Sequence, residues 1–190
     1  LLSFSTKHRI NIISYMNHIY IYTSLNKFIC NFVSGVDPTS SESLIVSDNT
    51  VGRLHVLSPS APLSAQQAYQ LSRLARRPFQ TASDGIFLFV ADNTGHLVKA
   101  RLADGHPVPN MLGVRPNYAC SPLTDPFGIA LHPPPPATPR VCFVVDRGAA
   151  CIWAFDANTL DPLFSFGGEL DDPCGCAVTP DGRLLVCDRG

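Results

Sequence analysis

Four aspartates recur in the sequence, each at the end of a short apolar run. The runs are "LIVSD", "FLFVAD", "VCFVVD" and "LLVCD", which end at Asp48, Asp92, Asp146 and Asp188. A carboxylate can act as a general acid or base, or bind a hard metal ion. However, an active site normally uses its acid once, whereas a carboxylate after a strand can accept backbone N–H bonds across a turn. We therefore predict a structural turn role for all four.

The aspartates mark a repeat of uneven length. Successive intervals are 44, 54 and 42 residues. A second shared element, a Pro-x-Gly turn opening an apolar strand, is written "PFGIALH" at 126–132 and "PCGCAVT" at 173–179. The long interval contains "HPPPPATP" at 132–139, where the other copy has the tight turn "TPDGR". A proline run lacks N–H donors and cannot join a central ladder, so it predicts a protruding hairpin loop.

The clearest copy of the repeat runs from 125 to 168. It predicts four short strands, "GIAL", "VCFVVD", "CIWAF" and "LFSFG". Four strands in a unit of roughly 40 to 45 residues are typical of a β-propeller blade. The predicted fold is all-β, a propeller of four-stranded antiparallel blades over 37–190, incomplete, with about three to four blades. A β-sandwich with accidental similarity is the alternative.

Residues 1–36 differ in composition from the rest of the chain. The stretch "INIISYMNHIYIYTSLNKFICNF" at 10–32 is rich in Ile, Asn and Tyr. It lacks both the apolar run of about 18 residues that a membrane helix needs and the cleavage site of a secretory signal. The alternation in "IYIY" predicts one or two strands, and a non-native segment is the alternative. We expect no membrane insertion.

The charge balance argues against a large nucleic-acid surface. Charged residues make up 15% of the chain and the formal net charge is −1, so no global field attracts nucleic acid or an anionic membrane. The one basic cluster, "RLARR", carries Arg73, Arg76 and Arg77 and is interpreted as a solvated loop or helix face. These arginines are candidates for phosphate contact, but aromatic residues are not interleaved with them, as RNA binding would favour.

The seven cysteines form no CxxC pair; they are Cys30, Cys120, Cys142, Cys151, Cys174, Cys176 and Cys187. On a strand, Cys174 and Cys176 would face the same side, which suits neither a disulfide nor zinc. We predict buried free thiols, which favour a reducing, cytoplasmic location.

The segments "PCGCAVTPDGRLLVCDRG" and "PFGIAL…VCFVVDRGAACIWAFDANTLDPLFSFGG" resemble NHL repeats. The resemblance covers 37–190 and is strongest from 125 onward, although "IWAFDANTLDPLFSF" is also similar to a YVTN-type repeat. NHL repeats commonly carry Arg just before the third strand, where this chain has Arg53, His96 and Cys151. NHL-like propellers usually have six blades, so this chain resembles a partial copy.

The resemblance implies a non-catalytic scaffold that binds proteins or, less readily, RNA through variable loops. Here those loops are "HPPPPATP" and the stretch 103–126. Arg53 and His96 join the basic cluster as candidate contact residues. No cofactor and no catalytic residue is expected.

The alternative is a metal-dependent enzyme resembling gluconolactonases, strictosidine-synthase-like proteins or amidating lyases. Such propellers gather oxygen or His ligands around calcium or zinc. Gluconolactonase-like repeats often carry Asn or Asp at the x of Pro-x-Gly, where this chain has Phe127 and Cys174. His132, after a first strand, is the remaining metal candidate, and a single His there is more often a loop residue.

Overall fold

The structure, a computed structural model, describes the segments 2–3, 10–15, 18–23, 44–48, 52–57, 67–70, 75–108, 118–119, 123–132 and 140–190. These residues form 16 strands and their turns, and no helix. Accordingly, the described part of the chain contains no helix of the length and apolar character that crossing a membrane requires.

The strands form separate antiparallel sheets, each built from neighbours in the sequence. Blade A contains β4 (Leu44–Asp48), β5 (Arg53–Leu57) and β6 (Gln67–Gln70). Blade B contains β7 (Pro78–Ser83), β8 (Phe87–Asp92), β9 (His96–Arg101) and β10 (Tyr118–Ala119). Blade C contains β11 (Pro126–Leu131), β12 (Val141–Asp146), β13 (Cys151–Asp156) and β14 (Pro162–Phe166), and blade D contains β15 (Pro173–Val178) and β16 (Leu184–Asp188).

A further sheet lies near the N-terminus of the chain. It consists of β1 (Leu2–Ser3), β2 (Ile10–Tyr15) and β3 (His18–Thr23), paired in that order. Whether residues 1–36 are native to the protein stays a prediction.

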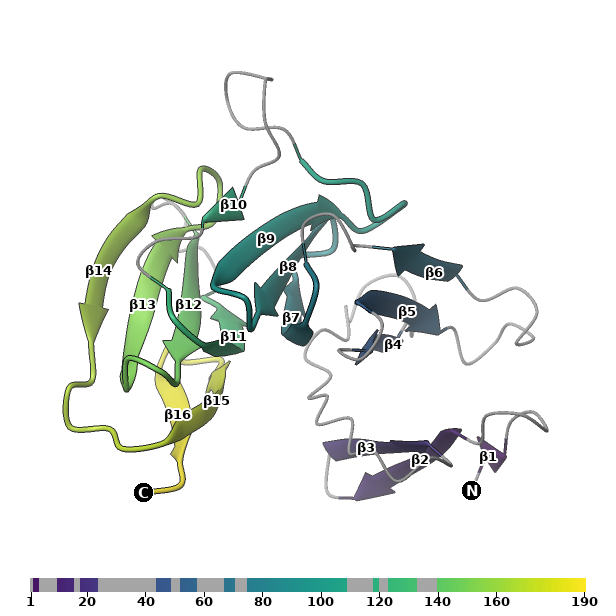
Figure 1. Ribbon diagram of the computed structural model, residues 1–190, viewed down its shortest axis with the longest axis horizontal. Coiled ribbons are helices and arrows are strands. Elements are labelled where there is room, and N and C mark those ends of the chain that lie inside the picture. The colour runs from purple at the N-terminus through teal and green to yellow at the C-terminus, as the bar shows by residue number, and fades with distance from the viewer. Residues whose placement is uncertain are drawn as a thin grey trace.

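The blades fan out with the first described strand of each innermost; in blade A that strand is β4, which ends at Asp48 and so corresponds to the second strands β8 and β12. In Figure 1, β4, β7 and β11 lie toward the middle of the fan, and β6, β10 and β14 lie at its outside. The strand β7 lies beside β4, and β11 lies between β7 and β15. Equivalent residues of neighbouring blades also touch, as Phe79 and Phe127 do, so the blades share one orientation. The predicted all-β propeller, incomplete and with blade C running as the repeat indicated, is confirmed.

Alternation along the strands gives blades B and C two apolar faces each. In β8, Leu88 and Val90 join the cluster shared with blade A, whereas Phe89 and Ala91 join the cluster shared with blade C. All four side chains are completely buried. Because successive side chains of a strand point to opposite faces, blade B is a core layer for both of its neighbours.

The Pro-x-Gly element is not the turn that the sequence predicted. Pro126 is already part of β11, where it pairs with Asp146, and the register shifts between Pro126 and Gly128. The same shift occurs between Pro173 and Gly175. The element is therefore a β-bulge at the start of the first strand, a place where a strand tolerates proline.

Gly128 allows the first strands of blades C and D to approach closely. A Cβ atom at Gly128 would lie 2.8 Å from the carbonyl oxygen of Cys174 and 3.0 Å from a methyl carbon of Val145. The glycine is thus needed for packing between blades rather than for turn geometry.

The sequence analysis missed the first strand of blade B. Pro78 pairs with Asp92 as Pro126 pairs with Asp146. Gln80 stands where blade C has glycine, and its Oε1 accepts a hydrogen bond of 3.0 Å from the buried N–H of Ile129 in blade C. The sequence did contain a signal for this strand: "PF" precedes Asp92 by nearly the same number of residues as "PC" precedes Asp188.

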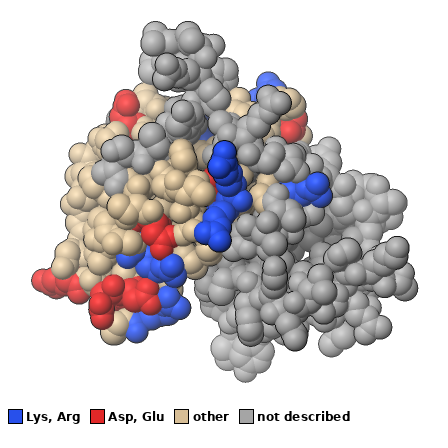
Figure 2. Space-filling model, in the orientation of Figure 1, with Lys and Arg blue, Asp and Glu red and all other residues tan. Residues whose placement is uncertain are grey.

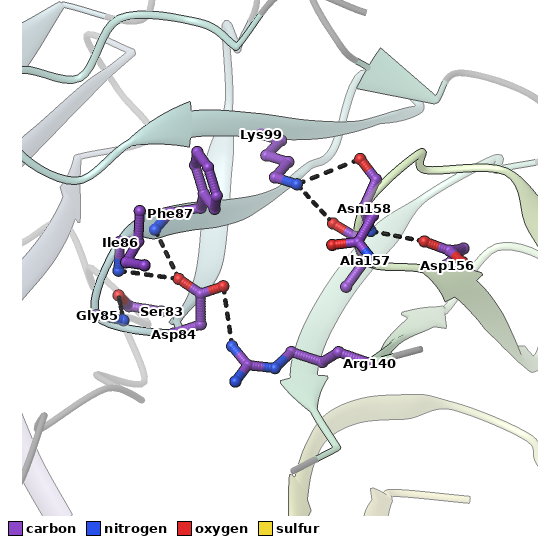
Figure 3. Close-up of polar contacts among 10 residues, drawn as sticks. All are labelled: Ser83, Asp84, Gly85, Ile86, Phe87, Lys99, Arg140, Asp156, Ala157 and Asn158. Carbon is purple, nitrogen blue, oxygen red and sulfur yellow. Dashed lines mark hydrogen bonds and ion pairs between the residues drawn. The ribbon is translucent and has the colours of Figure 1, made fainter. Parts of the chain in front are cut away.

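A buried lysine links blades B and C at the end opposite the aspartate turns (Figure 3). Lys99 of β9 is only 4% exposed. Its Nζ donates to the carbonyl oxygens of Ala157 at 2.8 Å and Asn158 at 3.2 Å, and it lies 4.4 Å from the ring centroid of Phe87. Burial lowers the pKa of Lys99, although nearby carboxylates oppose that effect. Its hydrogen bonds to the two carbonyls offset part of the desolvation cost.

An ion pair connects the same two blades. Arg140, just before β12, lies 2.8 Å from Oδ2 of Asp84 in the turn between β7 and β8. The other oxygen of Asp84 accepts the N–H groups of Ile86 and Phe87, which fixes the carboxylate in place. Fixing one partner in advance reduces the entropy that the ion pair must overcome.

Replacing Lys99 with methionine should destabilise the fold by about 1 to 3 kcal/mol, because two carbonyl groups lose a charged donor. The measurement is urea unfolding followed by circular dichroism. Arg101→Met, on the same strand but 55% exposed at the side chain, is the control and should change stability by less than about 0.5 kcal/mol. Equal effects from both variants would contradict the role given to Lys99.

Candidate functional site

Asp92 holds the start of its own blade. Its Oδ2 accepts the N–H of Arg76 at 2.8 Å, and its Oδ1 accepts the N–H of Arg77 at 2.9 Å. Thr94, in the turn after β8, donates both its N–H and its hydroxyl to the same carboxylate. The carboxylate therefore connects the turn after the second strand to the segment that enters the first strand.

Asp146 makes the equivalent contacts in blade C. Its carboxylate accepts the N–H groups of Thr124, Asp125 and Ala149 at 2.7, 2.8 and 3.3 Å, and the Thr124 hydroxyl at 2.6 Å. Asp146 is completely buried, so these hydrogen bonds supply the partners that its carboxylate needs away from water.

Asp188 repeats the arrangement on blade D, where it is exposed to solvent. It accepts the N–H groups of Asp171, Asp172 and Gly190 at 3.1, 2.8 and 3.4 Å. The backbone bond from Asp171 is the main cause that holds the pKa of Asp188 below its ordinary value. The side chain of Asp48 lies outside the described residues.

Three residues of this chain align with the arginine of NHL repeats, and they occupy equivalent positions in the strand pairing. Arg53, His96 and Cys151 each begin a third strand, where they pair with Asp48, Asp92 and Asp146, respectively. The Nδ1 of His96 lies 3.1 Å from the hydroxyl of Thr94. All three residues therefore lie at the end of the blades that carries the turns after β8 and β12, which we call the Asp-turn end.

The Asp-turn end brings together candidates that are far apart in the sequence. A Cβ atom at Gly52 would lie 3.2 Å from the carbonyl oxygen of Arg76, so the turn that carries Arg53 packs against the segment leading into β7. Arg76 and Arg77 are exposed in that segment. Arg73 lies outside the described residues.

At the Asp-turn end, equivalent positions of the blades carry side chains of different charge. The residue before the first proline is Arg77 in blade B, Asp125 in blade C and Asp172 in blade D. The backbone carbonyl of each accepts an N–H from Asn93, Arg147 and Arg189, respectively, which confirms that the positions are equivalent.

Ion pairs neutralise this position in two blades. In blade C an Nη of Arg147 lies 2.8 Å from Asp125, and in blade D an Nη of Arg189 lies 2.7 Å from Asp172. Blade B instead has Arg77 beside Asn93. Blade B therefore carries an exposed positive charge at the position where blades C and D each carry an ion pair.

Two aromatic rings lie next to these charges, which the sequence analysis did not foresee. The ring centroids of Phe79 and Phe127 are 4.3 Å apart, and the guanidinium carbon of Arg147 lies 5.0 Å from the Phe127 centroid. Phe79 and Phe127 are both half-buried. The rings come from bulges 48 residues apart, so the separation of basic and aromatic residues in the sequence disappears in the fold.

His132 lies at the opposite end of blade C. A Cβ atom at Gly182, in the hairpin turn of blade D, would lie 3.0 Å from the Nε2 of His132. The His132 ring also meets the edge of Phe143, with centroids 6.4 Å apart. Among the side chains that the structure describes, no group of three or more His, Cys, Asp or Glu residues is arranged to hold a metal ion.

The prediction of uniformly buried thiols is wrong for three of the five described cysteines. Cys142 and Cys176 are buried, Cys151 and Cys174 are partly exposed, and Cys187 is exposed. Cys174 and Cys176 also differ in burial, because the bulge at Cys174 breaks the alternation of the strand. All five are free thiols, and Cys30 and Cys120 lie outside the described residues.

The other predicted recognition loops are only partly described. Residues 133–139 of the proline-rich loop lie outside the described residues, as do 109–117 and 120–122 of the stretch 103–126. Within that stretch, Tyr118–Ala119 forms the short outer strand β10, which pairs with β9.

Asp146→Ala should cost about 2 to 4 kcal/mol, because it leaves several buried N–H groups without an acceptor. Asp188→Ala, which removes the equivalent but exposed carboxylate, should cost much less. Chemical denaturation of both variants measures the difference. Equal losses would show that burial does not decide the strength of this contact.

The thiols should react in the order of their exposure. Burial raises the pKa of Cys176 to about 12 and also raises the pKa of Cys142, so both remain protonated at pH 8 as well as shielded. Iodoacetamide labelling at pH 8 with peptide mass spectrometry should modify Cys187 first, and Cys142 and Cys176 only in denaturant. Rapid labelling of Cys142 in the native protein would contradict the packing between blades B and C.

Comparison with known proteins supports the fold. No family model and no curated protein matches the sequence. The chain is similar to the WD40 β-propeller domain of Doa1, with a TM-score of 0.57 and 9% identity over 97% of this chain and 58% of that one. It is also similar to AztD from Citrobacter koseri, with a TM-score of 0.51 and 14% identity over 94% of this chain and 44% of that one.

The chain thus spans about half the length of these two structures. At such identities the similarity concerns the fold alone. Together with the blade register and the aligned aspartates, it identifies the described blades as those of a β-propeller.

Proposed function

We propose that this propeller is a non-catalytic, NHL-like scaffold that binds a protein partner at the Asp-turn end. The observation that carries the proposal is the variation at equivalent positions. One backbone frame presents Arg77, Asp125 and Asp172 in three successive blades. A rigid frame with variable surface residues is suited to recognition.

The repeated carboxylates support this interpretation. Asp92, Asp146 and Asp188 accept backbone N–H groups within their own blades, so their recurrence has an architectural cause. The residues that differ between blades are then the ones available for specificity. This division of roles is typical of repeat proteins, in which the frame is constant and the binding face varies.

The NHL-like assignment rests on the repeat pattern. Blades C and D share the Pro-x-Gly bulge and the strand that ends in aspartate, and blade C adds a third strand that ends in Phe-Asp. A closing Phe-Gly is formed by Phe166, the last residue of β14, and Gly167.

The metal-enzyme alternative lacks support at the bulge. Phe127 occupies the x position of blade C and is packed with Phe79 and Arg147. Cys174 occupies it in blade D. A phenyl ring supplies no ligand, and calcium prefers oxygen donors to a thiol.

The RNA alternative needs a larger basic surface. In the view of Figure 2, basic and acidic side chains are interspersed over the described residues. At the Asp-turn end, Asp171 and Asp172 of blade D lie in the positions of Arg76 and Arg77 of blade B. A polyanion bound across these blades would meet like charges.

Affinity capture with the full chain, followed by calorimetry on each purified candidate, tests the proposal. We expect at least one protein to bind saturably at a fixed stoichiometry. In parallel, the chain is assayed for lactone hydrolysis with added calcium or zinc. Metal-dependent turnover without any saturable protein partner would overturn the proposal.

A further inference from the structure

We propose that the Arg–Phe patch, formed by Arg76, Arg77, Phe79, Phe127 and Arg147, binds a short acidic peptide segment that carries an aromatic or large apolar side chain. The inference rests on the proposed scaffold function and names its binding surface and the chemistry of its partner. It starts from the point at which blade B departs from the charge pattern of blades C and D.

Arg76 and Arg77 supply the positive charge that blade B contributes to the patch. Arg76 and Arg77 expose their side chains while their N–H groups are held by Asp92, so the backbone beneath the charges is fixed. Fixing the backbone in advance lowers the entropic cost of presenting the two guanidinium groups. Guanidinium groups bind carboxylates in a bidentate manner, which favours a ligand that carries Asp or Glu side chains.

Blades C and D limit how far an anionic segment can extend on their side of the patch. Blade C is neutral at the equivalent place because Arg147 pairs with Asp125, and blade D adds Asp171 to its pair. Attraction therefore exists over blade B and declines toward blade D. A short acidic segment fits this distribution, whereas a long polyanion does not.

The rings add an apolar contact beside the charges. Phe79 and Phe127 are half-buried, so part of each ring is accessible from solvent. The two rings pack against each other with their centroids 4.3 Å apart, so part of each ring face is covered. The remaining surface suits contact with the edge of a side chain better than stacking with a nucleic-acid base. An aromatic or large apolar residue next to the carboxylates would cover this area, which favours a peptide over single-stranded RNA.

The test uses the full chain and four fluorescent probes. They are an acidic heptapeptide with a central tryptophan, its copy with alanine in place of tryptophan, its neutral copy with Asn and Gln in place of Asp and Glu, and a short oligouridine. The variant is Arg76→Asp with Arg77→Asp. It gives blade B the Asp-Asp-Pro sequence that blade D already carries, so it is compatible with the fold.

The matched control is Arg101→Asp with Arg183→Asp. It changes the net charge by the same amount at the opposite end of the blades, where both arginines are exposed. We expect the acidic peptide to bind the wild-type chain and the control alike, and the Arg76 and Arg77 variant at least about tenfold more weakly. The neutral peptide should bind the wild-type chain and both arginine variants weakly. Higher salt should weaken the binding of the acidic peptide.

A second variant separates the apolar contact from the charges. Phe79→Cys introduces the residue that blade D has at this position. It should weaken binding of the tryptophan peptide several-fold, whereas the affinity for an acidic peptide with alanine in place of tryptophan should change little. Equal weakening by the two arginine variants, or tighter binding of oligouridine than of the acidic peptide, would overturn the inference.

The result also separates this inference from the scaffold proposal. A captured protein that binds the arginine variant and the wild type equally would refute the patch while leaving the scaffold function standing. Absence of any saturable protein partner, with acidic-peptide binding intact, would refute the scaffold proposal instead.

Discussion

The hydrogen bonds around the strand-end carboxylate are the contact on which blades B, C and D depend. The first and last residues of a blade's first hairpin lie side by side at the Asp-turn end. The chain segment that enters this hairpin has backbone N–H groups for which no strand supplies an acceptor. Asp92, Asp146 and Asp188 accept those groups. An unpaired buried N–H costs free energy comparable to a lost hydrogen bond, so one side chain per blade stabilises an otherwise unfavourable entry.

Contacts between blades begin just after the segment that this carboxylate holds. The segment that the carboxylate holds leads into a first strand with a bulge, and the bulges of adjacent blades touch through Phe79 and Phe127. Further along these strands, the side-chain oxygen of Gln80 accepts the N–H of Ile129. At the other end, Lys99 and the pair of Asp84 with Arg140 connect blades B and C. Polar links at both ends therefore enclose an apolar layer between the blades.

Binding specificity and architecture use different residues of one short segment. At the Asp-turn end, the backbone of Arg77 is held as the backbone of Asp125 is held, while the two side chains have opposite charges. A blade can thus change the charge that it presents without losing the contact that holds it. Such independence explains how divergent repeats retain one fold, because the donors in this variable segment are main-chain N–H groups and the acceptor is the repeated aspartate.

The sequence by itself determined the fold class, the strands of blade C and the turn chemistry of the aspartates. These features depend on alternation and local spacing, which a single chain displays directly. The first strand of blade B was missed because Gln80 replaces the glycine of the motif. The Pro-x-Gly element was interpreted as a turn because a bulge is defined by the pairing partners of its residues, which here lie 12 to 20 residues away in the sequence.

Only the tertiary structure decided where the candidate site lies. Gly52 meets the backbone of Arg76, and Phe79 meets Phe127, because equivalent ends of adjacent blades lie side by side. The burial of Lys99 was likewise invisible, since its carbonyl partners belong to the next blade. The local pattern determines each blade, whereas packing between blades determines which charges and rings become neighbours.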